Sequence, residues 1–162
     1  MKRFSSAAGL ALAVAVVLGL AGPTPAGEPV PFKGSLDGDV THTPVDARTD
    51  FVLVEAAGTA TQLGQFALDI PHFVDRPTRT AAGTYEFTAA NGDTVYAEFT
   101  GLASPTEIPG VLYIEEVATI KGGTGRFAGA TGSFTVERLY DRIAGTTIGS
   151  FEGTISLGVG QP

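Results

Sequence analysis

Two charged residues interrupt the apolar faces of two strand-like segments near the end of the chain. Residues 111–120 and 133–141 alternate apolar and polar side chains, with Glu116 in the middle of one apolar face and Arg138 in the middle of the other. Because alternate side chains of a strand point to opposite faces, both charges share a face with apolar neighbours. An isolated buried charge is costly, whereas a hydrogen-bonded pair of opposite charges is tolerated. The pattern predicts that Glu116 and Arg138 pair with each other.

The register of this pair follows from the glycine-rich segment between the two strands. A hairpin register with Gly122 opposite Gly132 places the two charges directly opposite each other. Two interpretations of the pair remain open. In the functional one, Glu116 and Arg138 bind a ligand inside an apolar lumen and orient its carbonyl or hydroxyl group. In the structural one, they are an ion pair without chemistry, or they lie on an outward face that a neighbouring subunit covers.

The histidines and carboxylates offer a second set of candidates. His42 and His72 fall in two separate segments that we expect to be loops, so we interpret both as surface histidines. Asp37 and Asp39 precede His42, but on the expected first strand they point to solvent. A two-histidine metal site needs a carboxylate in a defined geometry, so we expect no metal.

No motif for nucleophilic hydrolysis or cofactor binding is present. The chain lacks GxSxG, a Ser-His-Asp order and any cysteine. The glycine-rich segment at 122–132 lacks the Lys-Ser/Thr pair and the following helix of a phosphate-binding loop. We therefore expect no cofactor and assign no catalytic residue.

The elements that position Glu116 and Arg138 are predicted to be strands throughout. Short apolar runs separated by Gly, Pro, Asn and Asp indicate an all-β fold of about eight strands. An Asn-Gly turn at 90–93 joins two of them, and loops are expected at 42–50, 71–80 and 102–110. The expected strands are residues 32–40, 51–57, 59–70, 83–89, 94–101, 111–120, 133–141 and 147–157. A closed antiparallel barrel suits such short sequential strands, since closure removes exposed edges.

The N-terminus is typical of a secretory signal. Lys2 and Arg3 precede an apolar run at 7–21, and small residues end at Ala26, which predicts cleavage before Gly27. The run is shorter than a bilayer-spanning helix, although an uncleaved anchor remains the alternative. We expect a secreted or periplasmic protein with one domain at 27–162. Cleavage changes the net charge from −7 to −9, which argues against nucleic acid and anionic membranes as partners.

The segment from Gly122 to Phe134, GGTGRFAGATGSF, resembles a signature of the allene oxide cyclase and dirigent family of β-barrels. The placement of residues 84–87 and 149–155 is also similar to that family, and the resemblance is closest to bacterial secreted members. It implies a barrel whose lumen holds an apolar, reactive ligand and steers its cyclisation or coupling. It also implies trimers, which fits residues 51–57 being apolar on both faces apart from Glu55. No catalytic residue is carried over by the glycine motif.

Three functions follow as hypotheses. The barrel binds a small apolar ligand in its lumen, or it is a cyclase or isomerase that acts by positioning a reactive ligand. Alternatively, it is a structural or cell-surface protein with a filled lumen. Phenylalanine and leucine side chains meeting at the axis would favour the last hypothesis, whereas an open lumen with a few convergent polar groups would favour the first two.

Overall fold

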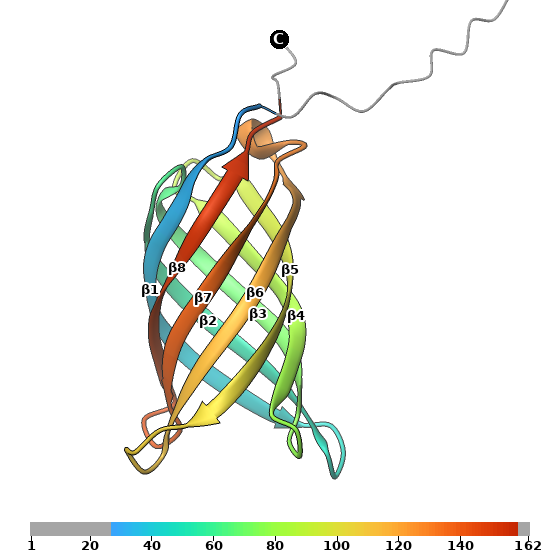
Figure 1. Cartoon of the computed structure of the whole chain (residues 1–162), viewed down its shortest axis with the longest axis vertical. Helices are drawn as coiled ribbons and strands as arrows, with labels where there is room; N and C mark the ends of the chain where they lie inside the picture. Colours follow the sequence, from blue (N-terminus) through green and yellow to red (C-terminus); the bar gives the residue numbers. More distant parts are fainter. Residues whose placement is uncertain (1–26, 159–162) are drawn as a thin grey trace, which may run out of the picture.

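The computed structural model describes residues 27–158, which form one closed antiparallel barrel of eight strands in sequence order, with β8 pairing back onto β1 (Figure 1). The strands are β1 Val30–Pro44, β2 Thr49–Ala60, β3 Gly64–Asp75, β4 Thr80–Ala89, β5 Thr94–Pro105, β6 Val111–Gly123, β7 Thr131–Asp141 and β8 Thr146–Ser156. The predicted all-β barrel is confirmed. The predicted signal at residues 1–26 lies outside the described residues.

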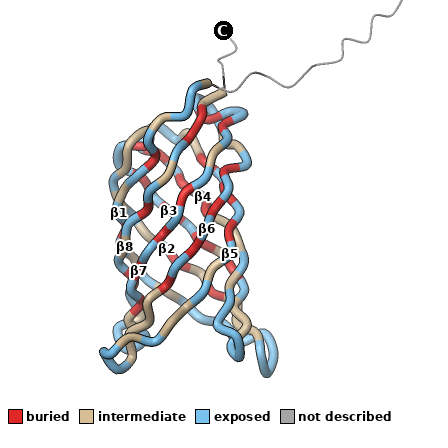
Figure 2. The backbone as a smooth tube through the Cα atoms, viewed as in Figure 1, coloured by how far each residue is buried: buried red, intermediate tan, exposed pale blue. Residues whose placement is uncertain are grey.

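Alternation along each strand separates the lumen from the outer wall. In β7, buried and exposed residues alternate from Phe134 to Tyr140, and β6 alternates in the same way from Ile114 to Ile120. Figure 2 shows this alternation continuing around the whole barrel. The inward face of every strand therefore contributes to one core. Within residues 27–158, no helix is both long and apolar enough to cross a membrane.

The two ends of the barrel differ. The end that we call the cap end carries the connections β2–β3, β4–β5 and β6–β7, the last of which contains the short helix η1 Gly125–Phe127 (Figure 1). Phe127 is fully buried there, and the Arg126 guanidinium lies 4.6 Å from the centre of its ring. The glycine-rich segment thus forms a structured cap over this end of the barrel. The other end, which we call the loop end, carries the turns at residues 45–48, 76–79, 106–110 and 142–145.

Several strands extend further towards the loop end than predicted. β1 and β2 enter the segment expected to be a loop at 42–50, β3 continues to Asp75, and β5 continues to Pro105. Pro71 is accommodated inside β3 because the ladder with β4 is interrupted there, between the pairs Asp69–Glu86 and His72–Gly83. A proline cannot donate to a ladder, and this gap removes the need for a donor. Proline was therefore a misleading loop signal at this position.

Glycines make room for the large lumen side chains. Glu116 pairs with Gly101 on the neighbouring strand, and Arg138 pairs with Gly149. A Cβ atom on either glycine would overlap the side chain of its partner. The same arrangement holds for His72 opposite Gly83. Large and small residues thus alternate across the ladders, as the narrow interior of a small barrel requires.

Aromatic rings fill the cap half of the lumen. Neighbouring ring centres in this cluster lie between 4.9 and 6.1 Å apart, mostly in edge-to-face or tilted arrangements. Such geometry is the favoured one for aromatic pairs. The aromatic cluster consists of Phe32, Phe66, Tyr85, Phe87, Phe99, Phe134 and Phe151, all at most 5% exposed.

Candidate functional site

Glu116 and Arg138 form a buried two-bond ion pair in the lumen. The Nε of Arg138 donates to Oε2 of Glu116 at 3.0 Å, and its Nη2 donates to Oε1 at 2.8 Å. The side chains are 0% and 2% exposed. Paired N–H groups of this kind match a carboxylate in both charge and shape. The predicted pairing and burial are confirmed, while the predicted role in ligand binding stays a prediction.

The predicted register of the pair is wrong by two residues. Glu116 lies opposite Val136, and Arg138 lies opposite Ile114, because Ile120 pairs with Gly132. The ladder between β5 and β6 shifts at the same place, which leaves Lys121 unpaired as a bulge. This bulge belongs to the ladder with β5, whereas the ladder between β6 and β7 is continuous up to Ile120. A shift of two residues keeps both side chains on the lumen face, and the diagonal pair remains within reach of a long guanidinium.

Two further side chains complete this buried group. Tyr85, which is fully buried on β4, donates its hydroxyl hydrogen to Oε2 of Glu116. The Nη1 of Arg138 donates to Oγ1 of Thr147 at 3.3 Å, and that hydroxyl donates to the carbonyl of Leu139 at 2.9 Å. We call Tyr85, Glu116, Arg138 and Thr147 the lumen quartet. It connects β4, β6, β7 and β8.

Electrostatics keep the quartet in one protonation state. Burial by itself raises the pKa of Glu116, but the Arg138 charge and the hydrogen bonds from Arg138 and Tyr85 outweigh burial and hold that pKa below its usual value. Burial lowers the pKa of Arg138, and the facing carboxylate more than reverses this. Burial and the Glu116 charge raise the pKa of Tyr85 well above its usual value. A charged pair beside a neutral phenol is therefore the stable state.

Arg138 keeps unused hydrogen-bonding capacity. A guanidinium has five N–H groups, and within residues 27–158 three of them donate to Glu116 and Thr147. The other two make no further hydrogen bond of normal geometry within these residues, although the Tyr85 hydroxyl also lies near the guanidinium. Because the side chain is 2% exposed, these donors lie inside the barrel, where a hydrogen bond to a charged donor is strong.

His72 is a lumen residue, which corrects its prediction as a surface histidine in a loop. It lies on β3, is 4% exposed, and packs its ring edge against Phe99 with centres 5.6 Å apart. Its Nδ1 hydrogen bonds to the carbonyl of Ile70 at 2.8 Å, which makes Nδ1 the protonated nitrogen. Burial lowers the pKa of His72. The ring is therefore neutral, and no described residue bonds to its Nε2, which is an acceptor.

The other predicted polar residues lie elsewhere. His42 is on β1 and not in a loop, and its ring is partly exposed at the loop end. Asp37 and Asp39 are exposed on the outer face of β1, as expected. Across residues 27–158, no group of three or more His, Asp or Glu side chains is close enough to hold a metal ion.

Sequence reasoning missed three polar lumen residues. Tyr85 shares the parity of Phe87 and Ala89 on β4, so strand alternation alone could have placed it in the lumen. His72 shares the parity of Ile70, but Pro71 concealed that the strand continues. Thr147 gave no signal, because a threonine near a strand end suits either face.

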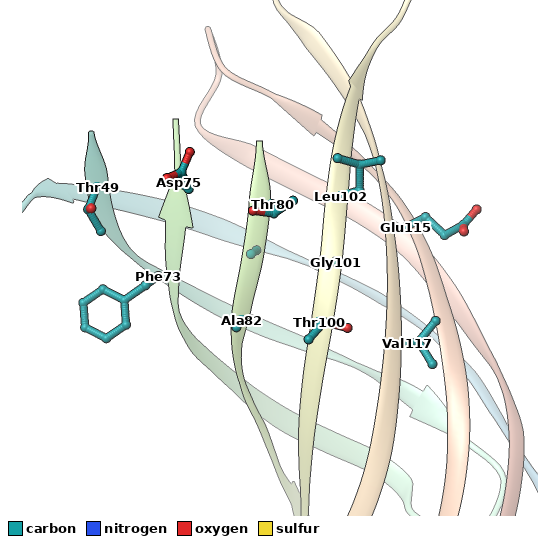
Figure 3. Close-up of a pocket in the computed structure, with 11 residues that line it drawn as sticks. Thr49, Phe73, Asp75, Thr80, Ala82, Thr100, Gly101, Leu102, Glu115 and Val117 are labelled. Atoms are coloured by element: carbon teal, nitrogen blue, oxygen red, sulfur yellow. The ribbon is translucent and has the colours of Figure 1, made fainter. Parts of the chain in front are cut away.

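A depression also lies on the outer wall, across β3 to β6 (Figure 3). It is lined by Phe73, Leu102 and Val117, which are 54%, 50% and 55% exposed. Three exposed apolar side chains along one depression form an unusual surface for a barrel wall. It is distinct from the lumen, because these residues have the opposite parity to the quartet.

Comparison with known proteins bears on the fold. No family model matches the sequence, and no curated protein does. The closed eight-stranded barrel is of the dirigent-like kind. One similar solved structure is that of a pterocarpan synthase dirigent protein, with a TM-score of 0.59 and 11% sequence identity over 90% of this chain and 99% of that chain. At this identity the likeness establishes the fold. The allene oxide cyclase and bacterial parts of the resemblance stay predictions.

Proposed function

We propose that this protein binds a small apolar ligand in the loop half of its lumen and holds an oxygen atom of that ligand with Arg138. The observation that carries the proposal is the pair of unused N–H groups on a buried guanidinium. A carbonyl or hydroxyl oxygen is the acceptor that would satisfy them. The dirigent-like fold supports a lumen site, since barrels of this strand number can enclose one small ligand.

The aromatic cluster restricts where such a ligand lies. It fills the cap half, so we place the proposed ligand towards the loop end. There the inward side chains are aliphatic, including Val52, Val54, Ile70 and Ile114, all at most 9% exposed. His72 adds an acceptor through Nε2. These side chains would suit a ligand with an apolar body, an oxygen that accepts from Arg138, and a donor that hydrogen bonds to Nε2 of His72.

A filled structural barrel is the second candidate. The observation that favours it is the aromatic cluster itself, in which phenylalanine rings meet at the axis. On this hypothesis the quartet is an ion pair that only stabilises the barrel, and the two spare donors of Arg138 bind water.

Native mass spectrometry of the protein purified from its own host tests these candidates. We expect a non-covalent adduct on the wild type that disappears on denaturation. The double variant Glu116→Leu/Arg138→Met removes both charges together and should lose the adduct while remaining folded. Glu98→Gln, on the outer wall, is the matched control and should retain it. A wild type without any adduct would support the filled barrel. An adduct whose mass changes during incubation with the protein would indicate turnover. This result would support the hypothesis of an enzyme that acts by positioning a reactive ligand.

We also propose a secreted or periplasmic location with cleavage after Ala26. The basic pair, the apolar run and the small residues before Gly27 support it. Intact-mass measurement of protein from culture medium or periplasm should give a chain that starts at Gly27. Retention of residues 1–26 in a membrane fraction would instead indicate an anchor.

We further propose a homo-oligomer, a trimer, that covers apolar parts of the outer wall. Phe73, Leu102 and Val117 support this, because all three are apolar, at least half exposed, and line one depression of the outer wall. Light scattering at increasing protein concentration should give three times the chain mass for the wild type and a smaller mass for Val117→Lys. Thr119→Lys, at an exposed polar position on the same strand, is the control. A monomer mass for the wild type at every concentration contradicts the proposal.

A further inference from the structure

A second polar group lies at the loop end, outside the lumen quartet. Oη of Tyr140 on β7 is 2.9 Å from Nε2 of His42 on β1, and their rings stack with centres 5.5 Å apart. Nδ1 of His42 is 3.8 Å from Oδ2 of Asp50 on β2. Arg76, in the turn after β3, approaches the other oxygen of Asp50 at 3.3 Å. Tyr140, His42 and Asp50 thus form a line that we call the loop-end triad.

The exposure of the triad increases along this line. Tyr140 is 7% exposed, whereas the His42 side chain is 37% exposed. The tyrosine therefore faces the lumen and the histidine reaches solvent. Val40 precedes His42 by two residues on β1, Val74 lies opposite Asp50 on β3, and Ala81 lies opposite Val74 on β4. All three are half-buried and pack on the core. The surroundings suit an apolar molecule with one polar group.

The bond between Tyr140 and His42 changes direction when His42 gains a proton. In neutral His42 with its hydrogen on Nδ1, towards Asp50, Nε2 accepts the hydroxyl hydrogen of Tyr140. The phenol oxygen can then only accept a hydrogen bond from a ligand. In protonated His42, Nε2–H donates to the phenol oxygen, and the hydroxyl hydrogen of Tyr140 becomes free to donate to a ligand.

The other charges near the triad leave this exchange intact. Burial raises the pKa of Tyr140, with Arg142 and Arg138 opposing the rise and Asp141 adding to it, so the phenol keeps its own hydrogen. Asp50 faces His42 from β2, and His72 faces it from β3. Within residues 27–158, the oxygen of Tyr140 has no hydrogen-bond partner other than His42.

We propose that Tyr140 and His42 form a ligand-binding site whose hydrogen-bonding preference reverses with protonation of His42. With His42 neutral, the site binds the hydroxyl of an apolar alcohol. With His42 protonated, it also binds a carbonyl oxygen of a ligand that has no donor of its own. Tyr140 lies two residues from Arg138 on the inward face of β7, but the test below uses other probes and does not need the ligand proposed for Arg138.

Two probes of equal size test this reversal. Cyclohexanone can only accept a hydrogen bond, whereas cyclohexanol can donate and accept. Histidines exchange a proton between about pH 8 and 5, so binding of each probe to the mature chain is followed by NMR at both values. We expect cyclohexanone to bind about threefold to tenfold more tightly at pH 5, the effect of one hydrogen bond. Cyclohexanol should change by less than about twofold, since it pairs with either state of the site.

Variants localise the effect. Tyr140→Phe removes the phenol oxygen and should abolish the pH response of cyclohexanone, and His42→Gln should abolish it without removing Tyr140. In the wild type, the largest chemical-shift changes on addition of either probe should occur at the signals of Tyr140 and His42. If Tyr140→Phe fails to fold, His42→Gln alone shows whether the pH response of cyclohexanone binding depends on this site. Equal cyclohexanone affinity at both pH values, an undiminished response in His42→Gln, or no binding of either probe would overturn the proposal.

Discussion

In the cap half of the lumen, six phenylalanine rings and the ring of Tyr85 pack against one another, whereas in the loop half a bidentate ion pair, two histidines and Tyr140 lie among aliphatic side chains. The same eight strands build both halves with the same inward parity. Strand alternation thus determines which residues point into the lumen. Their position along the barrel axis determines whether they pack in the apolar core or belong to the polar groups. The cap half supplies a rigid, apolar base, and the loop half carries the groups able to contact a ligand.

The largest expected effect comes from breaking the ion pair of the loop half. Arg138→Ala leaves Glu116 buried without its partner and should lower the free energy of unfolding by about 3–5 kcal/mol. Urea unfolding measures this change. The double variant Glu116→Leu/Arg138→Met leaves no lone charge in the lumen, so it should recover much of the loss. We therefore expect the double variant to be clearly more stable than Arg138→Ala.

An exposed ion pair provides the control for that experiment. Nζ of Lys121 lies 3.1 Å from Oε2 of Glu98 on the outer wall, and both side chains are about half exposed. Lys121→Ala should cost less than about 1 kcal/mol. If Arg138→Ala lowers the free energy of unfolding by a similarly small amount, the quartet is hydrated. The lumen would then not differ from the outer wall in its access to water.

A smaller effect is expected from loosening the cap half. Phe134 contacts Phe32, Tyr85, Phe87 and Phe151, with ring centres 5.3 to 5.9 Å apart. Phe134→Leu keeps an apolar side chain but removes these ring contacts, so it should cost about 1–3 kcal/mol in urea unfolding. Phe73→Leu on the outer wall should change stability by about 0.5 kcal/mol or less. Equal costs at both positions would show that the cap half is not close-packed and can admit a ligand.

The smallest effect concerns pH and His72. Because burial lowers the pKa of His72 in the folded protein, the unfolded chain takes up the proton first, near pH 6.5. The stabilising contribution is therefore complete above about pH 6.5 and declines as the pH falls towards the folded pKa. Urea midpoints of the wild type should decrease between pH 7 and pH 5, and this slope should be shallower in His72→Asn. His42→Gln is the comparison that should keep the slope due to His72; a loss of the slope there instead would assign it to the loop end.

Local patterns were enough to predict the strands and the two charges of the quartet. Alternation depends on neighbouring residues only, so it placed Glu116 and Arg138 on inward faces before any pairing was known. Their register was wrong, because the ladder between β6 and β7 ends with Ile120 opposite Gly132, and matching the glycines of the connecting segment does not reveal this pairing. The bond from Tyr85 to Glu116 joins β4 to β6, which lie on either side of β5 and are not adjacent strands. Alternation within a strand does not reveal which side chains of two non-adjacent strands meet across the strand between them.

The pairing of large lumen side chains with glycines has an evolutionary consequence. Arg138 faces Gly149, and Glu116 faces Gly101, so each polar group has a vacant position beside it on the next strand. Exchanging the two members of a pair moves the polar side chain to the neighbouring strand and keeps the total side-chain volume constant. Cores tolerate changes that conserve volume well. A barrel built in this way can acquire a new arrangement of polar groups through a few paired substitutions, without a change of backbone, and unrelated binding preferences can arise on one scaffold.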